Sequence, residues 1–217
     1  MIKRKSRNGV FEHLKNNDDL SVVDLGCGTN GACPYADVLV DRNDWSDKFT
    51  GKKFVTHDLN NSPLPFEDKE FDFCFASHIL EHVTDPVTFC KEMTRISKSG
   101  YIEVPMPLID NLVSGDDGWD PNGHKWWCYF NDDESKLVLR PRRHIVHKTV
   151  DIPELNKLYP FFRDSFVLQV YWEDSIELEM GDEKYSYEET EYDLSQNQLD
   201  PWILGVSVLS KWSNQNG

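Results

Sequence analysis

Short apolar runs separated by polar segments fill the first half of the chain and predict β-strands. The runs lie at 21–25, 38–41, 54–58, 71–76 and 101–104. Runs this short, rich in Val and Phe and bounded by Gly, Pro, Asn or Asp, are typical of buried strands. They alternate with loops and with helical patterns. This alternation favours a largely parallel sheet.

Two segments have the spacing of amphipathic helices. Residues 9–17 place three apolar side chains on one helical face. A second helix is expected to begin at Asp85-Pro86, where a side-chain acceptor precedes a proline suited to the first turn. Gly100 is expected to end this helix in a left-handed conformation. Its apolar stripe consists of Phe89, Met93 and Ile96, with Cys90 beside it.

The connection between the first two strands is too short for an ordinary helix. Only residues 32–37 separate Gly31 from the run at 38–41, whereas a mean helix has ~11 residues. Six extended residues still span about 20 Å, and the return along a four-residue strand needs only ~13 Å. We therefore expect a parallel second strand reached by a shortened first crossover helix.

The second half of the chain is less regular. Residues 108–150 are expected to form an insertion after the fifth strand, and 153–159 a short helix. Runs at 166–172 and 202–212 predict the final strands, and alternation over 176–187 predicts a hairpin extension between them. The expected fold is α/β, Rossmann-like, with a mostly parallel sheet and an antiparallel last strand.

Composition limits the class of protein. A chain of 217 residues and 25.3 kDa is most simply one domain, 1–217. Its net charge of -15 repels polyanions, which disfavours binding to nucleic acid or anionic membranes. Five cysteines without scaffold-like spacing indicate reduced thiols. The basic N-terminus lacks the apolar stretch of a secretory signal, and no run approaches the ~18 residues of a membrane span. A cytoplasmic protein is expected; the oligomeric state is left open.

Polar residues follow the predicted strands at the positions where a sheet binds ligands. A glycine-rich turn with glycines at 26, 28 and 31 follows Asp24, and glycine allows close approach of a ligand to the backbone. The next two runs end at Asp41 and Asp58. Singly, each aspartate could be a helix cap or a solvated strand end, but their repetition favours a ligand crevice. Without a full helix after the turn, a pyrophosphate site for NAD is disfavoured.

Together these segments resemble the class I S-adenosylmethionine-dependent methyltransferase family. The similar segments are 22–29, the acidic tips Asp41 and Asp58, 64–72 and 77–83, in the family's order over roughly 20–107. The resemblance implies that about 18–107 is the donor-binding half and that about 108–150 is an acceptor-side insertion. The final strands and hairpin extension would then occupy about 166–212.

The resemblance also implies the cofactor, S-adenosyl-L-methionine, and the residues that bind it. The turn would hold the methionine part, Asp41 the ribose hydroxyls, and Asp58 with the Leu59 backbone the adenine edge. A carboxylate can accept hydrogen bonds from two vicinal hydroxyls, each worth about 1.5 to 3 kcal/mol. The predicted cofactor-binding residues are Asp24, Gly26, Cys27, Gly28, Asp41, Asp58, Leu59, Ala76 and Ser77.

The expected reaction is methyl transfer to a small-molecule acceptor, with a hydroxyl of a sugar or glycosylated metabolite as the predicted target. A hydroxyl must lose a proton, and a positioned base adds about 10² to 10⁴-fold. Histidine titrates near neutrality, so the candidate catalytic residues are His78, His82 and His124. Ordinary packing or surface positions are the competing interpretation for each.

Other features suggest weaker hypotheses. Trp126 and Trp127 are interpreted as core or lid packing in preference to a sugar-stacking platform. The acidic run at 188–193 is interpreted as a solvated face, so no metal is predicted. A basic cluster could bind an acceptor phosphate or carboxylate, although a solvated hairpin is favoured; it consists of Arg140, Arg142, Arg143 and Lys148, with His144 and His147 among them.

Two alternative functions remain open at the level of the sequence. One is a nicotinamide-dependent reductase, which the missing helix argues against. The other is a non-catalytic nucleoside-binding or regulatory module.

Overall fold

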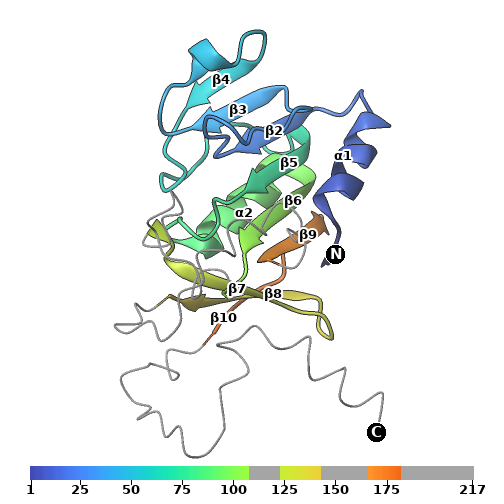
Figure 1. Cartoon of the computed structure of the whole chain (residues 1–217), viewed down its shortest axis with the longest axis vertical. Coiled ribbons are helices and arrows are strands. Elements are labelled where there is room, and N and C mark those ends of the chain that lie inside the picture. The colour runs from blue at the N-terminus through green and yellow to red at the C-terminus, as the bar shows by residue number, and fades with distance from the viewer. Residues whose placement is uncertain (108–122, 143–165, 182–217) are drawn as a thin grey trace, which may run out of the picture.

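The computed structural model describes residues 1–107, 123–142 and 166–181, and its main element is a seven-stranded sheet (Figure 1). Its strand order is β1-β9-β6-β5-β2-β3-β4. The strands are β1 (Ile2–Arg4), β2 (Val22–Leu25), β3 (Val38–Asp41), β4 (Lys53–Thr56), β5 (Phe71–Ser77), β6 (Ser97–Pro105) and β9 (Val167–Glu173).

The sheet has the predicted mixed character. Strands β4, β3, β2, β5 and β6 pair in parallel with their neighbours, whereas β9 is antiparallel to β6 and β1 is antiparallel to β9. The Rossmann-like fold class is therefore confirmed, with β9 as the antiparallel strand beside the parallel set. The predicted strand at 202–212 and the predicted helix at 153–159 lie outside the described residues.

Helices cover the two faces of the sheet. Helix α1 (Arg7–Lys15) buries Val10 and Leu14 in the same apolar cluster as Phe73 of β5. Helix α2 (Pro86–Ile96) buries Met93 in the other cluster, together with Cys74 of the same strand. Successive strand side chains point to opposite faces, so α1 and α2 cover opposite sides. None of the described helices is long and apolar enough to cross a bilayer.

Both connections among the first parallel strands lack an α-helix. Residues between β2 and β3 form turns, so the first crossover is even shorter than the predicted abbreviated helix. Between β3 and β4 only a single-turn 3₁₀ helix, Ser46–Lys48, is present. Loops, and no α-helix N-termini, therefore follow the carboxyl ends of β2 and β3.

Helix α2 begins as predicted but ends differently. The Asp85 side chain accepts a hydrogen bond from the Thr88 N–H at 3.0 Å, and proline occupies the first turn. The predicted stop at Gly100 is wrong, because the helix ends at Ile96 and β6 begins at the next residue. Gly100 lies inside β6, where an added Cβ would stand 2.6 Å from the Trp172 ring. Glycine is needed there for packing against β9.

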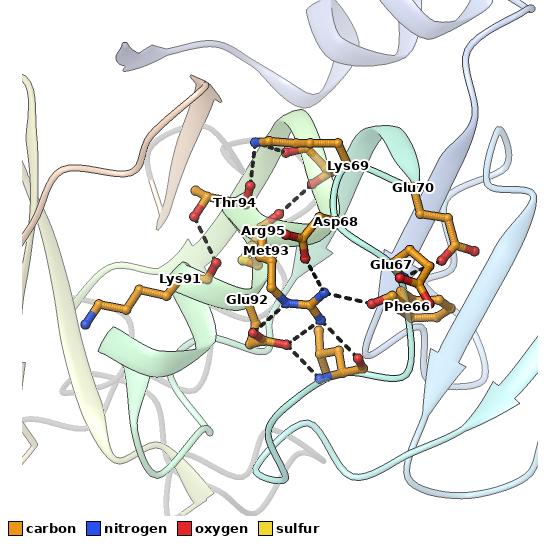
Figure 2. Close-up of polar contacts among 12 residues, drawn as sticks. Phe66, Glu67, Asp68, Lys69, Glu70, Lys91, Glu92, Met93, Thr94 and Arg95 are labelled. Atoms are coloured by element: carbon orange, nitrogen blue, oxygen red, sulfur yellow. Dashed lines mark hydrogen bonds and ion pairs between the residues drawn. The ribbon is translucent and has the colours of Figure 1, made fainter.

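Two basic side chains fasten the loop before β5 to the C-terminal part of α2 (Figure 2). The Arg95 guanidinium donates to the Phe66 carbonyl at 2.7 Å and the Leu64 carbonyl at 3.0 Å, while Glu92 holds it in place. The Lys69 ammonium donates to the Thr94 carbonyl in the last turn of α2 at 2.5 Å and to the Ser97 carbonyl just after it at 2.9 Å. Carbonyls at a helix end otherwise lack partners, so these contacts fix the loop and stabilise the helix end.

The described part of the predicted insertion contributes two strands to a second, three-stranded sheet, and the third strand comes from the segment after β9. Its order is β10-β8-β7, with β7 (Trp126–Asn131) antiparallel to β8 (Lys136–Pro141). Strand β10 (Leu178–Met180) pairs with β8 in parallel. The predicted hairpin placed 176–180 against 185–187; the second of these segments lies outside the described residues.

Candidate functional site

The carboxyl ends of the parallel strands bring the predicted polar tips to one edge of the sheet. Asp41 is paired with Thr56 in β3 and β4, and Asp58 follows β4 two residues later. At β5 and β6, Ser77 is paired with Glu103. This row, from Asp58 to Glu103, is called the ligand edge below.

The glycine turn after β2 folds back onto β3. The N–H groups of Gly26 and Cys27 both donate to the Val40 carbonyl, at 2.8 and 3.2 Å. Gly26 and Gly28 have φ angles of +77° and +58°, a region that side-chain-bearing residues rarely adopt. A Cβ added at Gly28 would meet no atom within 4 Å, so open space lies beside the turn.

Asp41 is held in a fixed orientation. One carboxylate oxygen accepts the Gly28 N–H at 3.0 Å and the other accepts the Asn43 N–H at 2.9 Å. Each carboxylate oxygen offers two lone-pair sites. The side chain can therefore accept further hydrogen bonds from a ligand without losing its backbone contacts.

Asp58 is exposed, and its carboxylate is bound by its own loop. Its Oδ1 accepts from the backbone and side-chain nitrogens of Asn60, each at 3.0 Å. These hydrogen bonds lower the pKa of Asp58. The carboxylate is consequently ionised at neutral pH. Leu59 beside it is buried.

Asp24 and Cys27 lie beneath the turn. The Asp24 carboxylate is 2% exposed and accepts the Cys33 N–H at 2.6 Å. Burial raises its pKa to about 7. Burial likewise raises the pKa of the Cys27 thiol to about 12, so the thiol is neutral. Asp24 supports the loop from below, and its contact with a ligand stays a prediction.

At the other end of the ligand edge, Glu103 is fully buried and has several partners. The Tyr101 hydroxyl donates to Oε2 at 2.7 Å, and the Ser77 hydroxyl donates to Oε1 at 3.2 Å. The Arg7 guanidinium and the His78 imidazole each approach Oε1 at 3.3 Å. Helix α1 thus contributes a cation to the site.

His78 lies between two carboxylates in a left-handed conformation, with φ of +56°. Its ring nitrogens are 3.3 Å from Glu103 and 3.5 Å from Glu81. Burial lowers the pKa of His78, but the two carboxylates outweigh burial and raise it to about 9. A protonated imidazole cannot accept a proton, which disfavours His78 as the predicted base.

All three predicted catalytic histidines converge on Glu81. His78 Nδ1, His124 Nε2 and His82 Nε2 lie 3.5, 3.9 and 4.0 Å from Glu81 Oε1. Glu81 is fully buried, and within the described ranges neither carboxylate oxygen has a hydrogen-bond partner. The His82 and His124 rings meet edge-on with centroids 4.6 Å apart. Burial lowers the pKa of His82.

The second sheet is fastened beside this cluster. The Lys125 N–H donates to the Glu81 carbonyl at 2.7 Å, and the Trp126 indole N–H donates to the Val83 carbonyl at 2.8 Å. Trp127 is buried. These positions favour the packing interpretation of both tryptophans. Of the basic cluster, only Arg140 and Arg142 lie in the described residues.

Sequence reasoning missed three charged residues of the site. Glu103 is the one charged residue in the apolar run 101–104, and that interruption was a usable signal. Glu81 stands directly before His82, but nothing in the sequence indicated its burial. Arg7 gave no signal, because it is one of several basic residues near the N-terminus.

Comparison with known proteins identifies the class. Residues 23–102 match the family described as "Methyltransferase domain". This segment contains the glycine turn, both acidic tips and Glu81, and its match supports the class I methyltransferase family that the motifs predicted. The match also supports the predicted cofactor, S-adenosylmethionine.

Individual relatives are distant. The chain is 25% identical over 121 residues to a sterol 4-C-methyltransferase of Caenorhabditis elegans, covering 46% of this chain and 34% of that protein. It is 32% identical over 81 residues to an uncharacterized methyltransferase of Mycobacterium tuberculosis, covering 37% and 31%. A solved S-adenosylmethionine-dependent methyltransferase from Mesorhizobium loti has 15% identity and a TM-score of 0.39, covering 70% and 90%. The chain thus spans about a third of the length of the curated relatives it matches.

Proposed function

We propose that the protein transfers a methyl group from S-adenosylmethionine to a hydroxyl of a small molecule. The observation that carries this proposal is the ligand edge, which combines a methyltransferase glycine turn and two acidic tips with a histidine cluster. The domain match supports the donor, and the histidine cluster supports an acceptor that must lose a proton.

The residues present suit the donor. Gly28, with open space beside it, leaves room for a ligand against the backbone, and Asp41 presents lone pairs in a fixed direction. Asp58 offers an ionised carboxylate at the neighbouring strand end. When bound, S-adenosylmethionine supplies an electrophilic methyl group on a cationic sulfur. The acidic tips of this edge favour a cation electrostatically.

The acceptor is proposed to bind at the histidine cluster. Ser77 is the last residue of β5 and His78 follows it, so the cluster adjoins the strand end at which the resemblance puts the reactive methyl group. His124 reaches it from the segment after β6. We assign His124 to proton removal from the acceptor, with His82 as its neighbour. A sugar or glycosylated metabolite is the proposed class, because a hydroxyl needs this assistance.

Calorimetry with S-adenosylhomocysteine tests the donor site. We expect binding by the wild-type chain and a loss of at least about tenfold in affinity for Asp41→Ala and Asp58→Ala, since each removes a charge-assisted acceptor. Asp47→Ala is the matched control, an exposed aspartate in the 3₁₀ helix. Absence of binding by the wild type would reject the proposal.

The acceptor is tested with a labelled donor. Mass spectrometry of a metabolite extract treated with the protein should show a labelled methyl group on oxygen of a polyhydroxylated product. A labelled sterol, or labelling on carbon or nitrogen, would overturn the acceptor class and leave the donor intact. Donor binding without transfer across the extract would favour the non-catalytic alternative.

The nicotinamide-dependent alternative loses support from the connection after the glycine turn. The residues between β2 and β3 contain no helix whose N-terminus could receive a pyrophosphate. The same calorimetry with NAD and NADP should show no binding.

A further inference from the structure

We propose that Glu81, His82 and His124 bind a divalent transition-metal ion at the ligand edge. Each of the three offers one ligand atom, and these atoms all lie within 4.8 Å of one another. The sequence indicated no metal, because the three residues come from two segments that only the fold brings together.

The state of Glu81 is the first argument for a cation. A fully buried carboxylate normally has hydrogen-bond donors for both oxygens, because burial without them is costly. Both Glu81 oxygens lack such partners among the described residues. Glu103, also fully buried, has Tyr101 and Ser77 as donors. The His78 imidazole, 3.5 Å from Glu81 Oε1, contributes charge but no hydrogen bond to either oxygen. A metal ion between Glu81, His82 and His124 would supply the missing direct partner.

The distances suit a common coordination sphere. Glu81 Oε1 is 3.9 Å from His124 Nε2 and 4.0 Å from His82 Nε2. Tetrahedral zinc, with ligands at about 2.0 to 2.2 Å, separates its donor atoms by ~3.3 Å. The two Glu81 pairs would close by less than about 1 Å, and the remaining pair, which lies within 4.8 Å, by up to about 1.5 Å. Such an adjustment is within the freedom of χ rotations.

The surroundings orient one imidazole for metal binding. His82 Nδ1 lies 3.0 Å from the Gly123 carbonyl, so this nitrogen carries the proton and donates. Nε2, which faces Glu81, is then left with its lone pair. Metal-binding histidines usually have a backbone carbonyl or carboxylate at the other ring nitrogen. The Lys125 N–H also fixes the Glu81 backbone.

The ligand set selects the metal class. Two imidazoles and one carboxylate suit zinc, cobalt, iron or nickel, whereas magnesium and calcium prefer oxygen ligands. Three protein ligands leave a coordination position open, as in catalytic zinc sites. The site is therefore of the type that binds a further oxygen ligand.

One consequence rests on the proposed function, whereas metal binding itself does not. An acceptor hydroxyl at the open position would be more acidic, as water is on zinc. Its proton would leave to solvent, and the oxygen electron pair would form the new bond to the methyl carbon. The electron pair of the broken carbon–sulfur bond stays on sulfur. The metal would then take over the activation otherwise assigned to a free histidine base.

Cobalt binding to the full chain, first stripped with a chelator, tests the site. We expect one Co²⁺ per chain by equilibrium dialysis. The bound ion should show visible absorption bands at about 500 to 650 nm, as expected for four- or five-coordinate cobalt with nitrogen and oxygen ligands. Zn²⁺ should displace the cobalt and abolish the bands. Lack of stoichiometric binding would overturn the proposal.

Substitutions locate the ion. Glu81→Gln, His82→Gln and His124→Gln should each weaken Co²⁺ binding by at least about tenfold, since each removes a direct ligand. His13→Gln, a histidine in α1 away from the cluster, is the matched control and should bind as the wild type does. Equal binding by the wild type and Glu81→Gln would contradict the assignment.

A folding control keeps this test decisive. Glu81→Gln preserves the side-chain shape and removes a buried charge, so the metal-free variant should unfold at a temperature no lower than that of the metal-free wild type. Zn²⁺ should raise the unfolding temperature of the wild type and not that of Glu81→Gln. Cobalt binding without S-adenosylhomocysteine binding would reject the proposed function alone, and the reverse result would reject the metal site alone.

Discussion

The two ends of the ligand edge carry the same chemical group in opposite environments. Over β3 and β4, Asp41 and Asp58 are at least partly open to solvent and accept hydrogen bonds from backbone N–H groups. Over β5 and β6, Glu81 and Glu103 are fully buried among cationic or titratable side chains. One sheet edge thus presents two kinds of carboxylate.

The difference indicates what each end can bind. A solvated carboxylate with spare lone pairs suits neutral donors such as hydroxyl and amino groups, because little solvation is lost. A buried carboxylate needs a positive partner. Glu103 has Arg7 of α1, and the His78 imidazole lies between Glu103 and Glu81. A metal ion is our proposal for the further partner of Glu81. The proposal thus puts recognition of the donor and activation of the acceptor at opposite ends of the edge.

The largest expected effect concerns the buried end. His124→Ala should lower turnover by about 10² to 10⁴-fold, whether the imidazole acts as a base or holds a metal. Donor affinity, measured by calorimetry, should stay within about twofold, since the proposed donor contacts of Asp41 and Asp58 lie at the other end. Unchanged turnover would discard His124 as an acceptor-side residue.

The second-largest expected effect is that of removing the Arg7 guanidinium beside Glu103. Arg7→Met keeps most of the side-chain volume but leaves Glu103 with the His78 imidazole as its remaining described cationic neighbour, which should lower the free energy of unfolding by about 1.5 to 3 kcal/mol. Denaturant unfolding measures this change. Adding Glu103→Gln to Arg7→Met should restore part of the loss, because the buried carboxylate that lost its guanidinium is removed. No restoration would show that Arg7 acts by packing alone.

Asp24, a buried carboxylate below the glycine turn, tests the comparison between buried and solvated carboxylates. Burial raises its pKa to about 7 in the folded chain, so its contribution to stability is present below about pH 4 and is lost as pH rises toward 7. Between pH 5 and pH 8 the wild type should lose roughly 2 to 3 kcal/mol relative to Asp24→Asn, which keeps an acceptor for Cys33 without a charge. Parallel stability curves for the two proteins would refute the buried, protonated Asp24.

The smallest expected effect concerns the glycine turn. Gly28→Ala meets no neighbouring atom but retains a φ of +58°, so it should cost about 1 to 2 kcal/mol. Gly51→Ala, with φ of +87° and equally open surroundings, is the matched control. Only Gly28→Ala should also weaken S-adenosylhomocysteine binding. Equal affinity in both variants would remove the turn from the donor site.

Features set by local chemistry were predictable from the sequence. The capping aspartate and the proline at the start of α2 act within one helical turn, and the prediction there was correct. The acidic tips were also correctly assigned to one edge, because parallel strands end on the same side. These signals need no knowledge of distant segments.

Features that depend on distant segments were not predictable. Glycine is a common residue at helix ends, yet Gly100 is required inside β6 because the Trp172 ring of β9 packs against it. The burial of Glu81 depends on Gly123 to Lys125, which return beside β5 from the second sheet. The parallel pairing of β10 with β8 likewise joins two segments far apart in the sequence, and no local pattern indicated it.

The pairing of β1 with β9 has a consequence for synthesis on the ribosome. Ile2 lies opposite Trp172, and the Arg7 side chain that follows β1 neutralises Glu103. The residues of β1 must therefore remain unpaired until β9 has been translated, and long-range contacts of this kind form slowly. Nascent chains that stall before β9 would expose an open strand edge to chaperones and to other copies.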